Sequence, residues 1–446
     1  MKTDDDGGLK LASLQRKLDE SIANGASHFV IPSGVHTFDG VDLIADGAQD
    51  LVISGHPAGS VTLLFSCNFG VVLRSCTNVS VHNITVGYVE PCYSQGSVTG
   101  KGKGTITYTV DAGFPTLDSP PMASRLRSLI VKVISWDPVT KLKIGVRLLN
   151  HSIPVRKLGP RSFEIGAGAE IGNIVTVGPR AGHTLLLTNC SRCGVLGVTI
   201  HGTSDMALVE YGGGGANVWR GNRVVRNETQ SPMGLLASIA DVFQSSGCEH
   251  GPLVQDNELS FAGDDCMNIH NYLSVVMRND ALDKKRVLVL DAVGEAALTG
   301  EGFPFHQDLN TFARVRVGDV ARVYDKHLGL SLATAVTAHE EADATTCQPL
   351  ANETLQGMGF RAGTRAWVGR VRCYWVTLRD EIPEPFTILP RAYVNIDRLS
   401  NAGAVVRNNS LHDCGGLRFN WRASAWQSPA PHRRHRGGHV ARVVRR

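Results

Sequence analysis

The sequence has no long hydrophobic run, and it has few residues of several other kinds. No stretch of about 18 apolar residues occurs, so no membrane span is predicted. Aromatic residues form only 6% of the 446 residues. Acidic residues are missing after Asp413, whereas eight arginines follow it, so the formal net charge of +4 becomes −4 for the rest of the chain. The body of the chain therefore gives no reason to expect a polyanionic partner such as nucleic acid.

The ten cysteines lack the regular spacing of metal ligands. Cys190 and Cys193 are the only close pair, and no second Cys-x-x-Cys or His-x-x-x-His segment accompanies them. Buried cysteines that fill small core positions are the simpler interpretation. The sequence therefore predicts neither a metal site nor a cofactor, and it does not determine any disulfide pairing.

The first residues of the chain, Met1 to Gly8, lack the apolar segment of a signal peptide. Either the chain is intracellular or its true start is missing. Seven Asn-x-Ser/Thr sequons, such as those at Asn83 and Asn352, would suit a secreted protein, although Asn-rich turns also produce sequons by chance. Secretion is suspected, but the sequence does not settle the compartment.

Glycine is abundant, at 48 residues, and turns that contain asparagine or glycine recur between short apolar strands. Apolar residues at helical spacing from Leu11 to Ile22, followed by Gly25, predict a helix over 9–24. A strand, a turn and a strand follow over 29–38. Such a helix and strand pair would cap the exposed first coil of a solenoid.

Weak internal repeats indicate the fold. Residues 251–259 match 403–411 in character, and 76–86 resemble 190–200. One unit is a turn, a short apolar strand, an asparagine corner and another strand. The units recur after 25 or 35 residues, which is too irregular for a propeller or a leucine-rich horseshoe. The sequence predicts an all-β protein: a right-handed parallel β-helix of the pectate-lyase type with an N-terminal capping helix and antiparallel β-barrel insertions.

Two stretches of alternating strands interrupt the repeats, and we expect both to be antiparallel insertions that project from the solenoid. Coiling resumes near Asn395. The predicted organisation is a cap with the first coils (1–101), a first insertion (102–168), central coils with the site (169–282), a second insertion (283–380), resumed coils (381–417) and a basic tail (418–446).

The tail has no strand alternation after Trp421, and it is predicted to be disordered or aberrant. A truncated or frame-shifted gene end is favoured over nucleic-acid binding by the tail. A β-helix that stopped here would leave a strand edge uncovered.

Three aspartates recur after about one coil. Asp241 precedes the doublet of Asp264 and Asp265 by 23 and 24 residues. Parallel strands lie about 4.8 Å apart, so the three carboxyls would meet once a bend turns both members of the doublet to one side. Paired carboxylates are what glycoside hydrolysis requires. We therefore expect a catalytic site, with turn structure and calcium binding as the alternatives.

Clustered like charges raise the pKa of at least one carboxyl and keep a proton available near neutral pH, while another carboxylate stays ionised to activate water. The hypothesis is an inverting hydrolase in which Asp264 is the acid and Asp241 with Asp265 holds the water.

Polar residues near the aspartates are candidates for binding sugar hydroxyls. Asn268, His270 and Asn271 follow the doublet, and Glu210 lies about one coil before Asp241. The alternatives are a stacked corner asparagine for Asn268, an internally satisfied histidine for His270 and a wide glycine-rich turn after Glu210. The predicted partner is a carbohydrate, with no nucleic acid and no membrane, and the oligomeric state is undetermined.

These residues resemble glycoside hydrolase family 110, the β-helix exo-α-1,3-galactosidases. The likeness spans about 10–415, and its similar segments are 241–253 and 263–270, with support from 11–38, 93–98 and 178–180. The resemblance implies catalytic roles for Asp241, Asp264 and Asp265, inserted antiparallel barrels, and hydrolysis of terminal α-linked galactose with inversion and without a metal cofactor. Later coils of that family have no counterpart after about 417.

Polygalacturonases are the nearest alternative class, because they also pair an Asp with an Asp-Asp-Cys doublet about one coil later. They add a Gly-His-Gly segment and an Arg-Ile-Lys segment, and neither occurs here. A non-catalytic carbohydrate-binding or structural β-helix is the other alternative. A β-helix of that kind does not require three stacked carboxylates.

Overall fold

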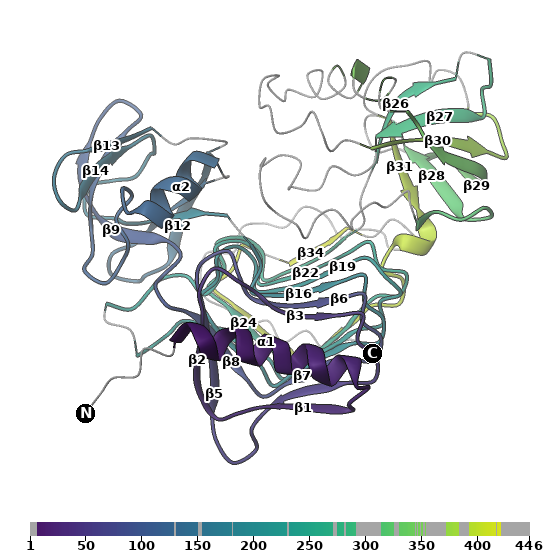
Figure 1. Cartoon of the computed structure of the whole chain (residues 1–446). Helices are drawn as coiled ribbons and strands as arrows, with labels where there is room; N and C mark the ends of the chain where they lie inside the picture. Colours follow the sequence, from purple (N-terminus) through teal and green to yellow (C-terminus); the bar gives the residue numbers. More distant parts are fainter. Residues whose placement is uncertain are drawn as a thin grey trace.

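The computed structural model describes most of the chain. It covers residues 7–128, 131–149, 154–180, 182–229, 232–270, 274–280, 282–290, 314–324, 330–343, 345, 347, 349–350, 353, 372–382, 392–415 and 417–420. The protein is mostly β, as predicted, and it contains three parallel sheets, one antiparallel sheet and one closed antiparallel barrel (Figure 1).

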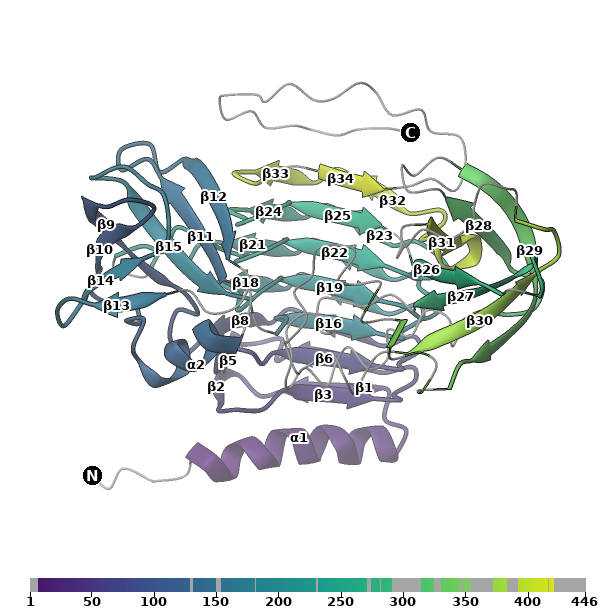
Figure 2. The ribbon, with the colours of Figure 1, turned by 90° about the horizontal axis from the view of Figure 1, so that it is seen from above.

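The three parallel sheets have seven strands each and form the main body. The chain gives one strand to each sheet in turn and then returns to the first, and we call each such set of three strands a circuit. The first sheet consists of β1 (His28–Ile31), β4 (Val52–Gly55), β7 (Ser80–His82), β17 (Gly194–Leu196), β20 (Val218–Arg220), β23 (Leu253–Gln255) and β32 (Val405–Arg407). The second consists of β2 (Gly34–Phe38), β5 (Val61–Phe65), β8 (Thr85–Tyr88), β18 (Thr199–His201), β21 (Arg223–Val225), β24 (Glu258–Ser260) and β33 (Ser410–His412). The third consists of β3 (Leu43–Asp46), β6 (Val71–Arg74), β16 (Leu185–Thr188), β19 (Leu208–Tyr211), β22 (Phe243–Ser246), β25 (Met267–His270) and β34 (Leu417–Asn420), and Figure 2 shows these strands stacked in chain order.

The repeats seen in the sequence are neighbours in space. Val81 pairs with Val195, and Leu253 pairs with Val405, so both pairs of similar segments lie in adjacent circuits. Alternate apolar residues of these strands share one buried core between the sheets, which Val81 and Val195 illustrate. The repeat therefore specifies the register of the stack.

Asparagines at one corner of successive circuits form a ladder. The Nδ2 of Asn222 donates to the Oδ1 of Asn257 over 3.0 Å, and the Nδ2 of Asn257 donates to the Oδ1 of Asn409 over 2.8 Å. All three side chains are buried, so the ladder satisfies polar groups that water cannot reach.

Helix α1 (Gly7–Ala23) covers the first circuit, as the capping prediction required, and it begins and ends slightly before the predicted 9–24. Leu14 and Leu18 of this helix are buried in the core of the stack. Gly25 follows with a φ of 64°, the left-handed conformation that ends helices at glycine.

The first insertion is a seven-stranded antiparallel sheet with one helix, α2 (Pro120–Ser128). In spatial order its strands are β12 (Lys143–Leu149), β11 (Val131–Trp136), β15 (Ile174–Pro179), β9 (Ser94–Lys101), β10 (Ile106–Val110), β14 (Ser162–Ile165) and β13 (Val155–Lys157). The predicted range of 102–168 is too narrow. The chain enters the insertion through β9 and leaves it through β15, and these two strands pair with each other. The prediction had placed both strands among the coils.

The second insertion is the closed barrel. In spatial order its strands are β26 (Ser274–Asn279), β27 (Arg286–Leu290), β30 (Cys373–Leu378), β29 (Leu330–Glu341), β28 (Val320–Tyr324) and β31 (Ala392–Ile396), and the short helix η4 (Asp397–Leu399) follows. The predicted range of 283–380 is again too narrow, because the barrel closes through the pairing of β26 with β31.

The last circuit runs further than predicted. Strand β34 extends to Asn420 and pairs with β25 from Leu417 onward, so the predicted tail boundary at 418 falls within a strand. Pairing with β25 gives the backbone of these residues hydrogen-bond partners, which the arginine-rich composition did not indicate. The rest of the predicted tail, 421–446, lies outside the described residues.

Six cysteines form disulfides, which the sequence left undetermined. The pairs are Cys67 with Cys92, Cys266 with Cys414, and Cys347 with Cys373. Four others are free and buried, as expected for core-filling cysteines, and they are Cys76, Cys190, Cys193 and Cys248.

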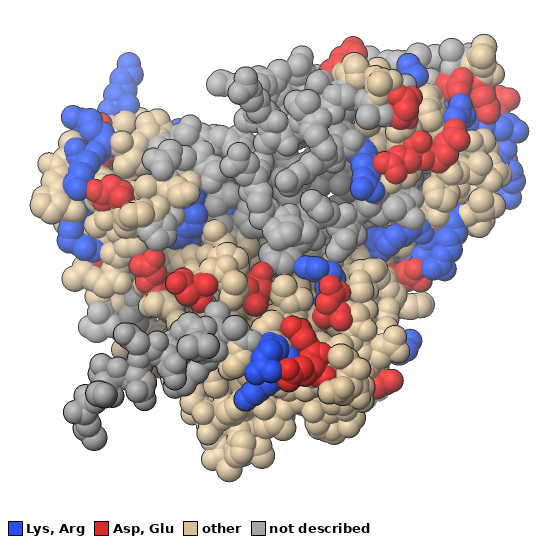
Figure 3. All heavy atoms as spheres, in the orientation of Figure 1, with Lys and Arg blue, Asp and Glu red and all other residues tan. Residues whose placement is uncertain are grey.

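Charged side chains are mixed on the surface. Acidic and basic residues are interspersed among the described residues on the face shown in Figure 3. None of the described helices combines the length and apolar character needed to cross a membrane.

Candidate active site

The three predicted aspartates meet at one end of the third parallel sheet. Asp241 lies just before β22, and Asp264 and Asp265 lie just before β25, the neighbouring strand. One carboxyl oxygen of each residue lies within 4.8 Å of the others. The spacing of about one coil therefore brings the residues together as expected.

A sharp bend before β25 lets both members of the doublet serve one site. The backbone N–H of Asp264 donates to the carbonyl oxygen of Ala240 over 3.3 Å, and that of Asp265 donates to a carboxyl oxygen of Asp241 over 3.3 Å. A Cβ at Gly263 would lie 2.1 Å from the carbonyl oxygen of Ile239, so the bend requires glycine at this position.

Asp241 is buried, with 6% of its surface exposed. Burial raises the pKa of Asp241 to about 7, and the charges of Asp264 and Asp265 add to this while Arg180 opposes it. The side chain of Asn268 donates to Asp241 over 3.2 Å and also opposes the increase. Asp241 therefore holds a proton in much of the population at neutral pH.

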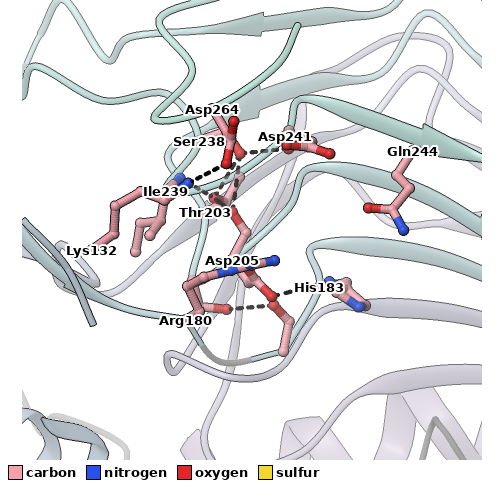
Figure 4. A network of polar contacts seen from close by, with 12 residues as sticks. Lys132, Arg180, His183, Thr203, Asp205, Ser238, Ile239, Asp241, Gln244 and Asp264 are labelled. Carbon is pink, nitrogen blue, oxygen red and sulfur yellow. Dashed lines mark hydrogen bonds and ion pairs between the residues drawn. The ribbon is translucent and has the colours of Figure 1, made fainter. Parts of the chain in front are cut away.

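Asp264 has a different environment. Its carboxylate accepts a hydrogen bond of 2.8 Å from the ammonium of Lys132, and its side chain is 40% exposed whereas that of Lys132 is 1% exposed. Lys132 and Asp241 lie on either side of Asp264 (Figure 4). The site therefore contains one buried carboxyl with a raised pKa, that of Asp241, beside one that is paired with an ammonium.

A second buried group of polar side chains lies beside the carboxylates (Figure 4). The guanidinium of Arg180 donates to Asp205 over 2.7 Å, and His183 lies 3.8 Å from the other carboxyl oxygen of Asp205. Tyr211 lies 3.4 Å from His183 and accepts a hydrogen bond of 3.3 Å from Gln244. These contacts link residues that precede β16 and β19 to Tyr211 on β19 and Gln244 on β22.

The structure places the predicted sugar-binding residues at different positions relative to the three aspartates. Asn268 and His270 are partly buried and alternate with the core residues Met267 and Ile269, so both point to the outer face of β25. Asn268 contacts Asp241 directly. Asn271 lies outside the described residues.

Glu210 does not share that face. Its neighbour Tyr211 points outward with Gln244, whereas Glu210 is buried on the interior side with the core. Asn217 and Trp219 each donate to Glu210 over 3.0 Å, and Ser245 also donates to it. Burial raises the pKa of Glu210, and these three donors oppose the increase. The placement gives Glu210 a structural role instead of the predicted one.

Several side chains of the candidate site have no counterpart among the predicted residues. Lys132 comes from the first insertion, 132 residues before its partner Asp264, and no motif links the two. Arg180 stands in one of the segments that carry the family resemblance, but its partner Asp205 had no signal. Comparison of the sequence with protein-family models and with curated proteins finds no match.

Proposed function

We propose that the protein is a glycoside hydrolase that cleaves terminal α-linked galactose. The observation that carries the proposal is the convergence of Asp241, Asp264 and Asp265, one carboxyl buried with a raised pKa and one paired with an ammonium. Acid and base of opposite protonation within one site are what glycosidic hydrolysis needs. The choice of galactose rests on the resemblance to family 110.

We also propose that the three sheets form a right-handed parallel β-helix. The succession of one strand per sheet, repeated in seven circuits, supports a solenoid. The capping helix and the two antiparallel insertions fit the architecture that the resemblance implies.

The electrostatics favour a reversal of the predicted roles. Asp241 holds the proton and so is the proposed acid, whereas Asp264, beside Lys132, is the proposed base with Asp265. In the proposed step, Asp241 gives its proton to the glycosidic oxygen as the bond from that oxygen to the anomeric carbon breaks. Water forms the new bond to that carbon and gives its proton to the base, so the products are free galactose and an alcohol.

The stereochemical outcome is a sharp test. Carboxyls of inverting enzymes lie about 6.5 to 9.5 Å apart, and those of retaining enzymes about 5 Å apart. The step above, in which water attacks the anomeric carbon directly, inverts that carbon, as the resemblance implies. The nearest oxygens here are within 4.8 Å, which is closer to the spacing of retaining enzymes. In a retaining step Asp264 would instead attack the anomeric carbon as the glycosidic bond breaks, and water would then hydrolyse the resulting ester. The anomer of the first product, measured by NMR, decides between the two.

The test of function is turnover of aryl α-galactosides and of α-1,3-linked digalactose by the full-length chain. Release of galactose, lost in Asp241→Asn and kept in the exposed-surface control Asp19→Asn, is the expected result. Cleavage of polygalacturonate instead would assign the alternative class. No turnover by the folded chain would favour a non-catalytic carbohydrate-binding protein or an inactive relative.

The proposed partner is therefore a carbohydrate, with no nucleic acid or membrane. Three disulfides suit an oxidising compartment, which supports the suspected secretion.

A further inference from the structure

Lys132 reaches the carboxylates from outside the parallel sheets. It lies on β11, a strand of the first insertion in which all six residues are buried. Its ammonium is 2.8 Å from Asp264, and only 1% of its side chain is exposed. Burial of a lysine without a charged partner is costly, so this position is a poor place for a lysine that only fills space.

A second lysine of the same hairpin lies close by. Lys143 on β12 donates to the carbonyl oxygens of Ala262 and Gly263 over 3.3 and 3.4 Å, just before the doublet. Burial lowers the pKa of Lys143, while Asp264 and Asp265 oppose the decrease. Two ammonium groups of one hairpin thus face the doublet.

The contact between the hairpin and the site is closely packed. Ile134 of β11 and Ile239, which precedes Asp241, belong to one buried core. A Cβ at Gly263 would lie 3.0 Å from the side chain of Ile134, and one at Gly178 would lie 2.9 Å from that of Ile239. Little space is left for the insertion to shift, so Lys132 is held in place by packing as well as by its ion pair.

The three carboxyls differ in their partners. Asp264 forms an ion pair with Lys132. Asp241 instead accepts hydrogen bonds from two uncharged donors, the backbone N–H of Asp265 and the side-chain amide of Asn268. Arg180 is the cation that acts on Asp241, and it is already bonded to Asp205. The positive charge of the hairpin therefore acts on the doublet: Lys132 pairs with Asp264, and Lys143 interacts with both Asp264 and Asp265.

We propose that Lys132 is a positioning residue, whose ammonium keeps Asp264 ionised and in place so that the transferable proton of the site stays on Asp241. This role rests on the proposed hydrolase function. The first insertion is then part of the active centre, and it acts without touching the substrate.

The test is Lys132→Met, which keeps a chain of similar length and removes the charge. The matched control is Lys101→Met, which removes a 46% exposed lysine of the same insertion from its ion pair with Glu170. We expect kcat to fall about 100-fold or more in Lys132→Met with KM changed less than about threefold, and a changed pH profile of kcat/KM. The control should match the wild type. An unchanged kcat and pH profile in Lys132→Met would overturn the proposal.

A second measurement does not depend on activity. Carbon-13 NMR of the aspartate carboxyls, assigned with Asp241→Asn and Asp264→Asn, follows each titration directly. We expect Asp264 to titrate at higher pH in Lys132→Met than in the wild type. Unchanged titrations of both carboxyls would refute the role of Lys132 even in an active enzyme. If wild type turns over no galactoside, the hydrolase proposal fails, whatever the titrations show.

Discussion

The parallel stack and the first insertion supply opposite charges to the same site. The stack contributes Asp241, Asp264 and Asp265 through the register of β22 and β25, while the insertion contributes Lys132 and Lys143 through one hairpin. Carboxylates placed by a repeat lie close together and repel one another. The lysines from the insertion make that arrangement uneven, and unequal carboxyls are what acid–base chemistry needs. The comparison teaches that the parallel sheets alone would supply only the acidic half of this candidate site.

The largest effect is expected when Asp241, the proposed acid in the parallel stack, is replaced. Asp241→Asn cannot give up a proton, so we expect kcat on an aryl α-galactoside to fall about 1,000-fold. Steady-state kinetics measure this loss, with Asp19→Asn on the surface of α1 as the control. Activity within tenfold of the wild type would remove Asp241 from the chemistry.

The same residue predicts a pH-dependent stability. Folding raises the pKa of Asp241 from 3.8 to about 7. The contribution of the protonated carboxyl to the free energy of unfolding is therefore fully present below pH 3.8 and is lost as the pH rises through about 7. This pKa shift corresponds to a change on the order of 4 kcal/mol in the free energy of unfolding. Asp241→Asn should therefore have a higher Tm than the wild type at pH 8, and the gain should disappear near pH 4. Thermal unfolding at both values tests this, and equal differences at the two pH values would contradict it.

The ion pair between the two regions can be broken from the acidic side. Asp264→Asn leaves the buried ammonium of Lys132 without its carboxylate, so we expect a loss of about 2 kcal/mol of stability, moderated by the exposure of Asp264. The double variant Asp264→Asn/Lys132→Met removes both charges and should recover most of the Tm. Additive losses in this double-mutant cycle would show that the two side chains are not coupled.

The smallest effect on activity is expected on the interior face of the stack. Glu210→Gln replaces an acceptor of three hydrogen bonds by an amide, and we expect a loss of about 1 kcal/mol in stability with kcat within about threefold of the wild type. Kinetics and thermal unfolding of this variant separate the two faces of β19. A loss of kcat as large as that in Asp241→Asn would show that Glu210 takes part in the activity, as first predicted.

The acidic half of the site could be predicted because the repeat fixes it. A spacing of 23 and 24 residues places Asp264 and Asp265 beside Asp241 whenever the coils stack in register. The basic half could not, since the position of Lys132 depends on how the insertion folds back onto the coils. Glu210 was predicted to line the site because it lies about one coil before Asp241, but this spacing does not say which face of the strand a side chain occupies. Its spacing of two from the buried Leu208 indicates the interior face.

The boundaries of both insertions were missed for a related reason. Strands β9 and β26 follow within a few residues of strands β8 and β25 of the parallel sheets, so local sequence does not mark the change of pairing partner. Antiparallel pairing with a strand far along the chain decides the boundary, as between Val175 and Gly96.

The asparagine ladder has a consequence for the order of folding. Asn257 and Asn409 are 152 residues apart along the chain, yet they are hydrogen-bonded neighbours. During synthesis, the earlier circuits can assemble as they emerge, but the final one must wait until the whole barrel has been made. Gly415 of that late segment donates its N–H to the carbonyl oxygen of Asp264. We therefore expect the carboxylate doublet to acquire its last backbone partner only at the end of folding, so a partly made chain would not yet hold a finished site.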